Sequence, residues 1–230
     1  MENLKILYED NHIIIVEKKP NIPSQADKTE DIDMLTIVKD YIKEKYNKPG
    51  NVYLGLVHRL DRPVGGVMVF AKTSKAAGRL SEQVREKIFK KKYLAVVDGK
   101  FDKRSGTLED YLYKDERNNM SKVVNKEKKN AKLAKLDYEM IIYNEVKDLS
   151  LVKVNLHTGR HHQIRVQLAN SGHSIFGDQK YGKRGQGKQI ALWAYSLTIQ
   201  HPITKEEMTF KDLPESVGTW CILKSINNEL

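Results

Sequence analysis

The sequence holds a single cysteine, Cys221, among its 230 residues. One thiol cannot form an internal disulfide, and it cannot build a zinc site of the cysteine type. No neighbouring pattern marks this thiol as catalytic. We therefore interpret Cys221 as a structural residue near the C-terminal end of the chain.

Long hydrophobic runs are also missing. A membrane-spanning helix needs roughly 18 to 20 consecutive apolar residues, and no stretch of the chain approaches that length. The first residues, Met-Glu-Asn-Leu-Lys, lack the charged start and the apolar segment of a signal peptide. A membrane span and a secreted protein are both disfavoured, and we expect the protein to be cytoplasmic.

Acidic residues are fewer than basic ones. Asp and Glu number 30 against 40 Lys and Arg, which gives a formal net charge of +10. Such an excess points to a polyanionic partner, either a nucleic acid or an anionic membrane surface. No strongly amphipathic basic helix is evident, so the membrane surface is the weaker of the two candidates.

The hydrophobic pattern predicts more strands than helices. Two short strands around an Asp-Asn turn are predicted within residues 6–18, and further strands at 67–71, 92–97, 131–144, 150–158, 192–200 and 208–211. Helices are predicted at 33–46 with Asp33 as cap, at 74–87 with Ser74 as cap, and at 163–169 ended by Gly172. The lysine-rich stretch 114–135 predicts a long exposed loop. We favour a simple solvated loop there, and the alternative is a loop that orders only on a polyanion. Without a regular alternation of strand and helix, we expect an α+β fold with a mixed, largely antiparallel central sheet.

The most informative residue is Asp61. Residues 58–66 read His-Arg-Leu-Asp-Arg-Pro-Val-Gly-Gly, directly ahead of the apolar strand 67–71. A loop held by a rigid strand is a common place for chemistry. The positive charge of Arg59 and Arg62 favours the ionised form of Asp61, which can then act as a nucleophile or a base. The alternative is an ordinary turn residue, salt-bridged to one of these arginines.

A second block, residues 156–166, reads Leu-His-Thr-Gly-Arg-His-His-Gln-Ile-Arg-Val. His157 and His161 are four residues apart, a spacing that invites a metal-site interpretation. However, Gly159 interrupts regular structure there, and no cysteine or local carboxylate completes a ligand set. We therefore predict no metal site, and favour a cleft in which Arg160 and Arg165 bind anionic RNA.

Together these strings resemble the RluA-type family of RNA pseudouridine synthases. The resemblance spans nearly the whole chain, in the family's order: Leu-Tyr-Glu-Asp at 7–10 with Lys-Pro at 19–20, His-Arg-Leu-Asp at 58–61, Lys-Tyr-Leu-Ala at 92–95, the block from Thr-Gly-Arg to Gly-Asp at 158–178, and His-Pro at 201–202. Two departures are present. Where many members read Asp-Thr-Ser-Gly, residues 63–66 read Pro-Val-Gly-Gly, which loses two hydroxyls and gains flexibility that the proline offsets. At position 161, His161 replaces a common Thr or Ser.

The resemblance implies the pseudouridine synthase catalytic fold. Residues 1–230 would form a single catalytic domain, with two sub-domains that share the sheet and an active-site cleft between them. Because the Leu-Tyr-Glu-Asp motif comes almost at once, we expect no separate N-terminal RNA-binding domain.

By the same resemblance, three residues carry the chemistry. Asp61 is the catalytic aspartate. Tyr93 is the tyrosine that stacks on the target base, although a core strand aromatic is the simpler alternative. Arg165 is the arginine that pairs with the catalytic carboxylate and orients it. A buried arginine–aspartate pair can also be purely structural, and here the two roles coincide.

Three further residues are implied to bind RNA. Arg59 resembles the arginine that fills the gap left in the RNA stack when a nucleotide is turned out. Arg160 is interpreted as a backbone contact. His162 is a secondary candidate whose alternative is a structural role.

The implied reaction converts one or more uridines of a tRNA or rRNA stem-loop into pseudouridine, with the target base flipped out of its stack. It needs no redox change and no energy input, so no cofactor is implied, and the chain has neither a Walker A string nor a dinucleotide fingerprint. We expect RNA to be the partner. We also expect a monomer that has no obligate protein partner. The alternatives are a non-catalytic RNA-binding or RNA-folding protein on the same scaffold, and a nuclease that uses the histidines of residues 157–162.

Overall fold

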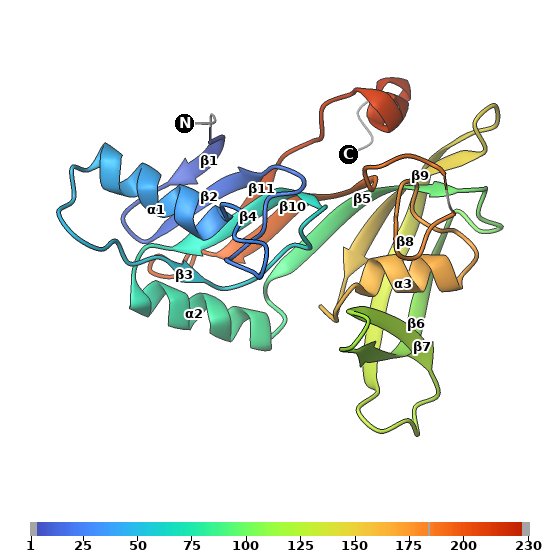
Figure 1. Ribbon diagram of the computed structural model, residues 1–230, viewed down its shortest axis with the longest axis horizontal. Coiled ribbons are helices and arrows are strands. Elements are labelled where there is room, and N and C mark those ends of the chain that lie inside the picture. Colours follow the sequence, from blue (N-terminus) through green and yellow to red (C-terminus); the bar gives the residue numbers. More distant parts are fainter. Residues whose placement is uncertain (1–3, 184, 227–230) are drawn as a thin grey trace. The chain divides into compact units, whose positions relative to one another are not determined.

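The computed structural model describes residues 4–183 and 185–226, which divide into two compact units (Figure 1). The first unit comprises Met1–Lys90 and Ala194–Leu213, and the second comprises Lys91–Trp193 and Pro214–Leu230. The chain therefore leaves the first unit, builds most of the second, and then returns to complete the first.

The sheet of the first unit has the strand order β1-β2-β4-β10, with β3 paired to β4 and β11 paired to β10. Its strands are β1 (Ile6–Glu9), β2 (Ile13–Lys18), β3 (Gly55–Leu56), β4 (Gly65–Ala71), β10 (Leu192–Gln200) and β11 (Glu207–Lys211). The pairs β1–β2, β2–β4, β3–β4 and β10–β11 are antiparallel. All seven residues of β4 are buried, and the strands predicted for this unit are confirmed, while the short β3 was not predicted.

Two helices belong to the first unit. In α1 (Met34–Lys45), Asp33 is the N-cap as predicted, and its Oδ1 accepts the backbone N–H of Leu35 at 2.9 Å. In α2 (Ser74–Arg85), the prediction of Ser74 as cap is wrong by one residue. Thr73 has the extended backbone of a cap and accepts the N–H of Ala76, whereas Ser74 is already helical.

The second unit is a five-stranded antiparallel sheet with the order β5-β9-β8-β6-β7. Its strands are β5 (Lys90–Asp98), β6 (Ser105–Asp115), β7 (Met120–Val124), β8 (Lys132–Asn144) and β9 (Leu149–Leu156). The prediction of a long exposed loop at 114–135 is wrong, because this stretch contains the end of β6, all of β7 and the start of β8. Frequent lysines lower its hydrophobicity, but the pairing of β6 with both neighbours fixes the strands.

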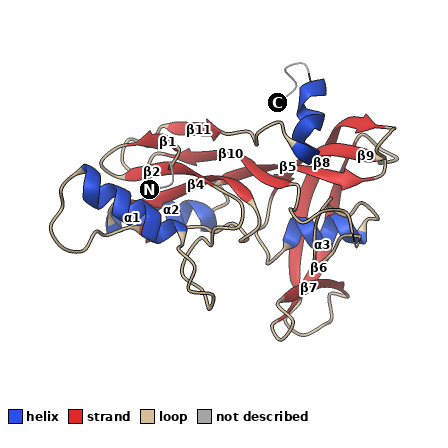
Figure 2. Ribbon diagram, turned by 45° about the horizontal axis from the view of Figure 1, so that its top comes forward, coloured by secondary structure: helices blue, strands red, loops and turns tan. Residues whose placement is uncertain are grey.

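One face of the β6–β7–β8 sheet is covered by α3 (Gln163–Asn170), as Figure 2 shows. Leu112 of β6, Ala134 of β8 and Val166 of α3 form a small buried cluster. The helix was predicted correctly, including its end before Gly172, whose φ is +88°.

The described residues hold eleven strands, three α-helices and one unpredicted 3₁₀ helix, η1 (Gly218–Ser225). This is an α+β fold, as predicted. Within residues 4–183 and 185–226, every helix is too short or too polar to cross a membrane.

Candidate active site

Asp61 lies in a turn that leads into β4. Its backbone carbonyl accepts the N–H of Val64 at 2.9 Å. The side chain of Lys18, at the end of β2, is fully buried beneath this turn. Its Nζ donates to the carbonyl oxygens of Lys19, Arg62 and Val64 at 3.2, 2.9 and 2.7 Å. An ammonium has three N–H donors, so Lys18 can serve all three carbonyls and thereby fix the backbone on the C-terminal side of Asp61.

Lys18 and Asp61 also interact through their charges. Burial lowers the pKa of Lys18 to about 7, while the carboxylate of Asp61 acts in the opposite direction and the cation of Arg62 adds to the lowering. A fully buried lysine next to the turn is therefore part of the electrostatic environment of Asp61.

The backbone on the N-terminal side of Asp61 is anchored as well. The hydroxyl of Ser24 accepts the N–H of Leu60 at 3.1 Å and donates to the carbonyl oxygen of the same residue at 2.8 Å. Two residues earlier, the buried ring of His58 accepts the N–H of Val69 through Nε2 at 3.1 Å and packs edge-on against Phe89. Asp61 is thus held between two fixed points.

The two arginines beside Asp61 have different surroundings. Arg59 is exposed, while residues 58 and 60 on either side of it are buried. The guanidinium of Arg62 donates to Thr29 at 2.8 Å, forms a short ion pair with Asp31, and lies 3.7 Å from Asp27. Arg62 therefore has two carboxylates of the 27–31 loop as partners.

Gly66, at the start of β4, permits a close approach of two backbones. Its φ is +123°, and a Cβ at this position would lie 2.2 Å from the carbonyl oxygen of Ala194. Gly65 and Gly66 are both buried within the strand. The glycine is required by packing.

Tyr93 lies in the middle of β5 in the second unit and is paired with Val154 of β9. It is buried, with 6% of its surface exposed. Lys91 is two residues earlier and therefore on the same face of β5. Burial lowers the pKa of Lys91, and its Nζ lies 3.6 Å from where a Cβ on Gly159 would be.

Arg165 projects from α3 and forms a bidentate ion pair with Asp178. Its Nε and Nη2 donate to the two carboxylate oxygens at 2.8 and 2.7 Å, and the two side chains are 5% and 0% exposed. Asp178 also accepts the backbone N–H groups of Lys180 and Tyr181. This fixed pair holds the guanidinium in one orientation.

His162 precedes α3 in a left-handed conformation with φ of 52°. Its Nδ1 lies 2.8 Å from the hydroxyl of Tyr181, and its ring stacks on His161. His161 in turn contacts Ser121 at 2.9 Å and Asn119 at 3.1 Å, which joins this block to β7. Burial, followed by the nearby charge of Arg165, lowers the pKa of His162 to about 2, so the ring is neutral at physiological pH.

His157 does not join the other histidines in a metal site. Its Nε2 lies 2.5 Å from the carboxylate of Asp137 on β8. In the part of the chain that the structure describes, no group of three or more His, Cys, Asp or Glu side chains could hold a metal ion.

Arg160 is exposed at the loop before α3. Its Nε donates to the carbonyl oxygen of Leu133 at 2.9 Å, and its backbone N–H donates to Gln163. Of the predicted site residues, Arg59 and Asp61 thus belong to the first unit. Tyr93, Arg160, His162 and Arg165 belong to the second unit, where Arg160, His162 and Arg165 lie within one loop–helix segment.

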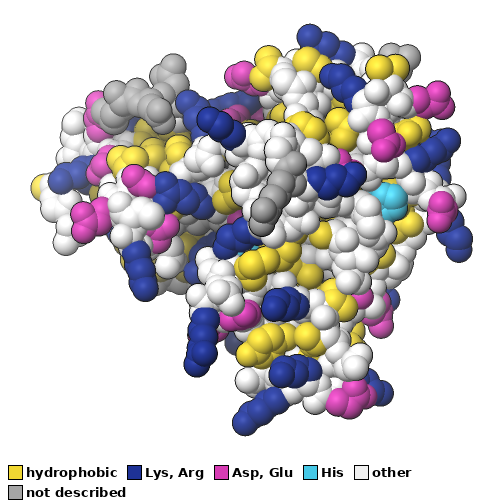
Figure 3. Space-filling model, turned by 45° about the vertical axis from the view of Figure 1, so that its right-hand side comes forward, with side chains coloured by type: hydrophobic (Ala, Val, Ile, Leu, Met, Phe, Trp, Pro, Cys, Tyr) yellow, Lys and Arg dark blue, Asp and Glu magenta, His cyan; other side chains and the backbone are white. Residues whose placement is uncertain are grey.

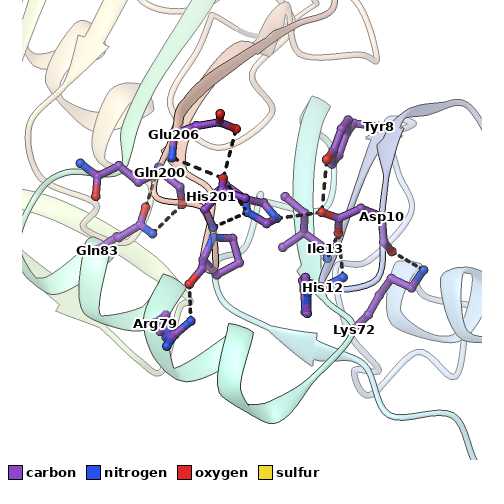
Figure 4. A network of polar contacts seen from close by, with 12 residues as sticks. Tyr8, Asp10, His12, Ile13, Lys72, Arg79, Gln83, Gln200, His201 and Glu206 are labelled. Atoms are coloured by element: carbon purple, nitrogen blue, oxygen red, sulfur yellow. Dashed lines mark hydrogen bonds and ion pairs between the residues drawn. The ribbon is translucent and has the colours of Figure 1, made fainter.

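The first and last sequence motifs of the first unit meet in a polar network (Figure 4). Asp10 accepts the N–H groups of His12 and Ile13 and lies 2.7 Å from Nε2 of the buried His201. The network adjoins the Ala71 end of β4, because β2 begins there, and Asp61 precedes the opposite end. Gly65 and Ala71 are six residue steps apart, roughly 20 Å along a strand, so this network lies far from Asp61 and forms a structural frame.

Two residues of the site were missed in the sequence. Lys18 continues the alternation of Ile14 and Val16 and so faces the core. A lysine is rarely fully buried, so its residue type argued against this position. Asp178 was noted within the Gly-Asp string, yet its partner Arg165 is 13 residues away and no local pattern joins them.

The chain is similar to proteins of known families. The sequence signature described as RNA pseudouridylate synthase matches residues 12–170. The uncharacterized RNA pseudouridine synthase YhcT of Bacillus subtilis is 35% identical over 207 residues, which cover 88% of this chain and 66% of that protein. The dual-specificity RNA pseudouridine synthase RluA of Escherichia coli K12 is 34% identical over 214 residues, which cover 90% of this chain and 92% of that protein.

The fold is also found among solved structures. Human RNA Pseudouridylate Synthase Domain Containing 4 superposes with a TM-score of 0.76 at 22% sequence identity, covering 92% of this chain and 89% of that one. At this identity the likeness concerns the fold alone.

Proposed function

The chain belongs to the RNA pseudouridylate synthase family and is an RNA pseudouridine synthase. We propose that it converts uridines of a tRNA or rRNA stem-loop into pseudouridine, with Asp61 as the catalytic aspartate. The observation that carries the proposal is the anchoring of the Asp61 turn. Ser24 holds the backbone before Asp61, and Lys18 holds the backbone after it. Such preorganisation is what a group that must meet a reacting atom requires.

The reaction is an isomerisation. The bond from uracil N1 to ribose C1′ breaks, the base turns, and C5 bonds to C1′; C5 then loses its proton and N1 gains one. Asp61 acts in its ionised form, either by adding to the base or ribose or by removing the ribose proton at C2′. Atoms and electrons balance without an oxidant, a reductant or a bound cofactor.

We assign supporting roles to two residues of the second unit. Tyr93 stacks on the uracil while the base turns, which its planar ring suits. Arg165 orients the catalytic carboxylate. Its bidentate pair with Asp178 supports this assignment, because that pair fixes the plane of the guanidinium.

RNA binding is assigned to Arg59, Arg160 and His162. Flipping a nucleotide costs about a few kcal/mol of lost stacking. The exposed guanidinium of Arg59 can offset part of this cost by stacking in the vacated position. Arg160 would contact the RNA backbone. His162, neutral and hydrogen-bonded to Tyr181, would shape the site without carrying charge. We also propose that both units serve one catalytic domain and that the protein acts as a cytoplasmic monomer.

The test is to incubate the wild type, Asp61→Asn and a control, Asp27→Asn, with bulk tRNA and rRNA that lack pseudouridine, and then to map the modified bases. We expect new pseudouridine with the wild type and the control, and none with Asp61→Asn. RNA affinity of Asp61→Asn should stay within a few-fold of wild type, because phosphate contacts dominate binding.

Undiminished turnover by Asp61→Asn would overturn the role of Asp61. An absence of modification by all three proteins, with salt-sensitive RNA binding intact, would instead favour a non-catalytic RNA-binding protein.

A further inference from the structure

The β6–β7–β8 sheet of the second unit has two different faces. On one face, Leu112 of β6 and Ala134 of β8 pack with Val166 of α3 and are buried. Side chains alternate along a strand, so the neighbours of Leu112 point to the opposite face. On that outer face, Tyr111 is directly paired with both Val124 and Leu133.

The next row of the outer face pairs Tyr113 with Lys122. The ammonium of Lys128, in the loop between β7 and β8, lies 5.4 Å from the centre of the Tyr113 ring. Leu133 is 39% exposed, and both tyrosines are partly exposed. The outer face thus holds two partly exposed tyrosines in neighbouring rows, the aliphatic side chains of Val124 and Leu133, and lysines beside them.

The positive charge of residues 111–135 favours a polyanionic partner for this face. Residues 111–135 contain eight Lys or Arg and three Asp or Glu, a net charge of +5 out of +10 for the whole chain. Two acidic residues of the outer face already have basic partners: Glu109 pairs with Lys135, and Asp137 with His157. Figure 3 shows Lys and Arg side chains interspersed with hydrophobic ones on the part that holds β6 and β7.

We propose that the outer face of the β6–β7–β8 sheet, which we call the tyrosine platform, binds an unpaired segment of the substrate RNA. The proposal rests on the proposed function, since the RNA is the one that would be modified. Tyr111 and Tyr113 stack on successive bases, and Lys122 and Lys128 contact the phosphates beside them. Aromatic side chains on an open sheet, flanked by cations, suit single-stranded RNA because every base has a stacking face.

Arg160 links the tyrosine platform to the predicted RNA-binding residues. Its Nε donates to the carbonyl oxygen of Leu133, so Arg160 lies against the same strand as the aliphatic part of the platform. A phosphate held by Arg160 and bases stacked on Tyr111 would therefore lie along one stretch of RNA.

The test measures binding of Asp61→Asn, the variant expected not to turn over, to labelled oligouridine of about twelve nucleotides, within the usual site size. Adding Tyr111→Ala with Tyr113→Ala should weaken binding about tenfold or more, since each stacked base contributes substantially. Phe at both positions should keep the affinity. Lys122→Gln with Lys128→Gln, both surface changes, should weaken binding and lower the slope of log affinity against log salt by about one to two.

The matched control is Tyr143→Ala with Lys100→Gln. Lys100 lies 5.3 Å from the ring centre of Tyr143, so this pair has the same chemistry outside the platform. Equal losses in the control and in the platform variants, or unchanged affinity in the platform variants, would overturn the proposal. The experiment measures affinity and does not depend on turnover. A protein that binds RNA through the tyrosine platform but forms no pseudouridine would therefore refute the proposed reaction while leaving the platform supported.

Discussion

Lys18 is a single buried side chain that fixes the turn after Asp61 through hydrogen bonds to backbone carbonyl oxygens. It is fully buried, and its ammonium serves three carbonyl oxygens, two of them within the turn after Asp61. A buried charge without such partners would cost several kcal/mol. The residue therefore links the first strands of the chain to the placement of the proposed catalytic group.

We predict that Lys18→Met lowers the free energy of unfolding by about 3 kcal/mol, because buried carbonyl oxygens lose their donor. The control is Lys19→Met, an exposed neighbour, which should change stability little. Urea unfolding of the two variants measures the difference. Equal stabilities would show that the three hydrogen bonds contribute nothing.

The same lysine predicts a pH dependence. Its pKa is about 7 in the folded protein and 10.5 ordinarily, so between these values the unfolded chain holds the extra proton. The contribution of Lys18 to the free energy of unfolding should then rise with pH from about 7 to 10.5. The urea midpoint should rise more between pH 7 and 9 for the wild type than for Lys18→Met.

Among the secondary-structure elements, β1 and α1 are joined through one carboxylate. Glu9 at the end of β1 accepts hydrogen bonds from Tyr41, Lys45, Tyr46 and Lys72 at 2.7 to 2.9 Å. Burial alone would raise the pKa of Glu9, but these four donors outweigh it and lower the pKa to about 2.

We predict that Glu9→Gln lowers the free energy of unfolding at neutral pH by about 3 kcal/mol, the equivalent of the pKa change. The carboxylate of Glu9 stabilises the folded state above its ordinary pKa of 4.5, and this stabilisation is lost as the pH falls toward 2. Acid unfolding of the wild type and the variant should therefore converge at low pH. A constant difference down to pH 2 would contradict the assignment.

Two glycines predict opposite effects of the same substitution. Gly66 in β4 has no room for a Cβ, whereas Gly78 in α2 is exposed, with nothing within 4 Å of a Cβ. Gly78→Ala should stabilise the protein by about 0.5 to 1 kcal/mol, since alanine is the better helix former. Gly66→Ala should lower the melting temperature sharply or prevent folding. Tolerance of Gly66→Ala would show that the backbones at residues 66 and 194 can separate.

Elements with local signals could be predicted from the sequence, and those set by distant contacts could not. Asp33 as an N-cap residue predicts the start of α1, and the uninterrupted apolar run 67–71 predicts β4. By contrast, Tyr111 and Leu133 belong to one row of a sheet only because residues 22 positions apart pair. The site divides in the same way: Asp61 could be named from its string, while the support that Lys18 gives it required the fold.

For the whole molecule, the net charge of +10 predicts a steep dependence of RNA affinity on salt. Log affinity should fall linearly with log salt concentration, with a slope of about 0.7 per phosphate neutralised on a single strand. Filter binding of unmodified tRNA at several salt concentrations gives the slope. An affinity independent of salt would contradict an electrostatic RNA surface.

The order in which the two units appear along the chain has a consequence for synthesis on the ribosome. β10 and β11 complete the first unit, yet residues 91–193, most of the second unit, are translated before them. Translation adds about 5 to 20 residues per second, so the wholly apolar β4 is exposed for several seconds before its neighbour β10 has been synthesised. During that interval the nascent chain presents an open strand edge, so chaperone binding is expected to peak before residue 200 leaves the exit tunnel.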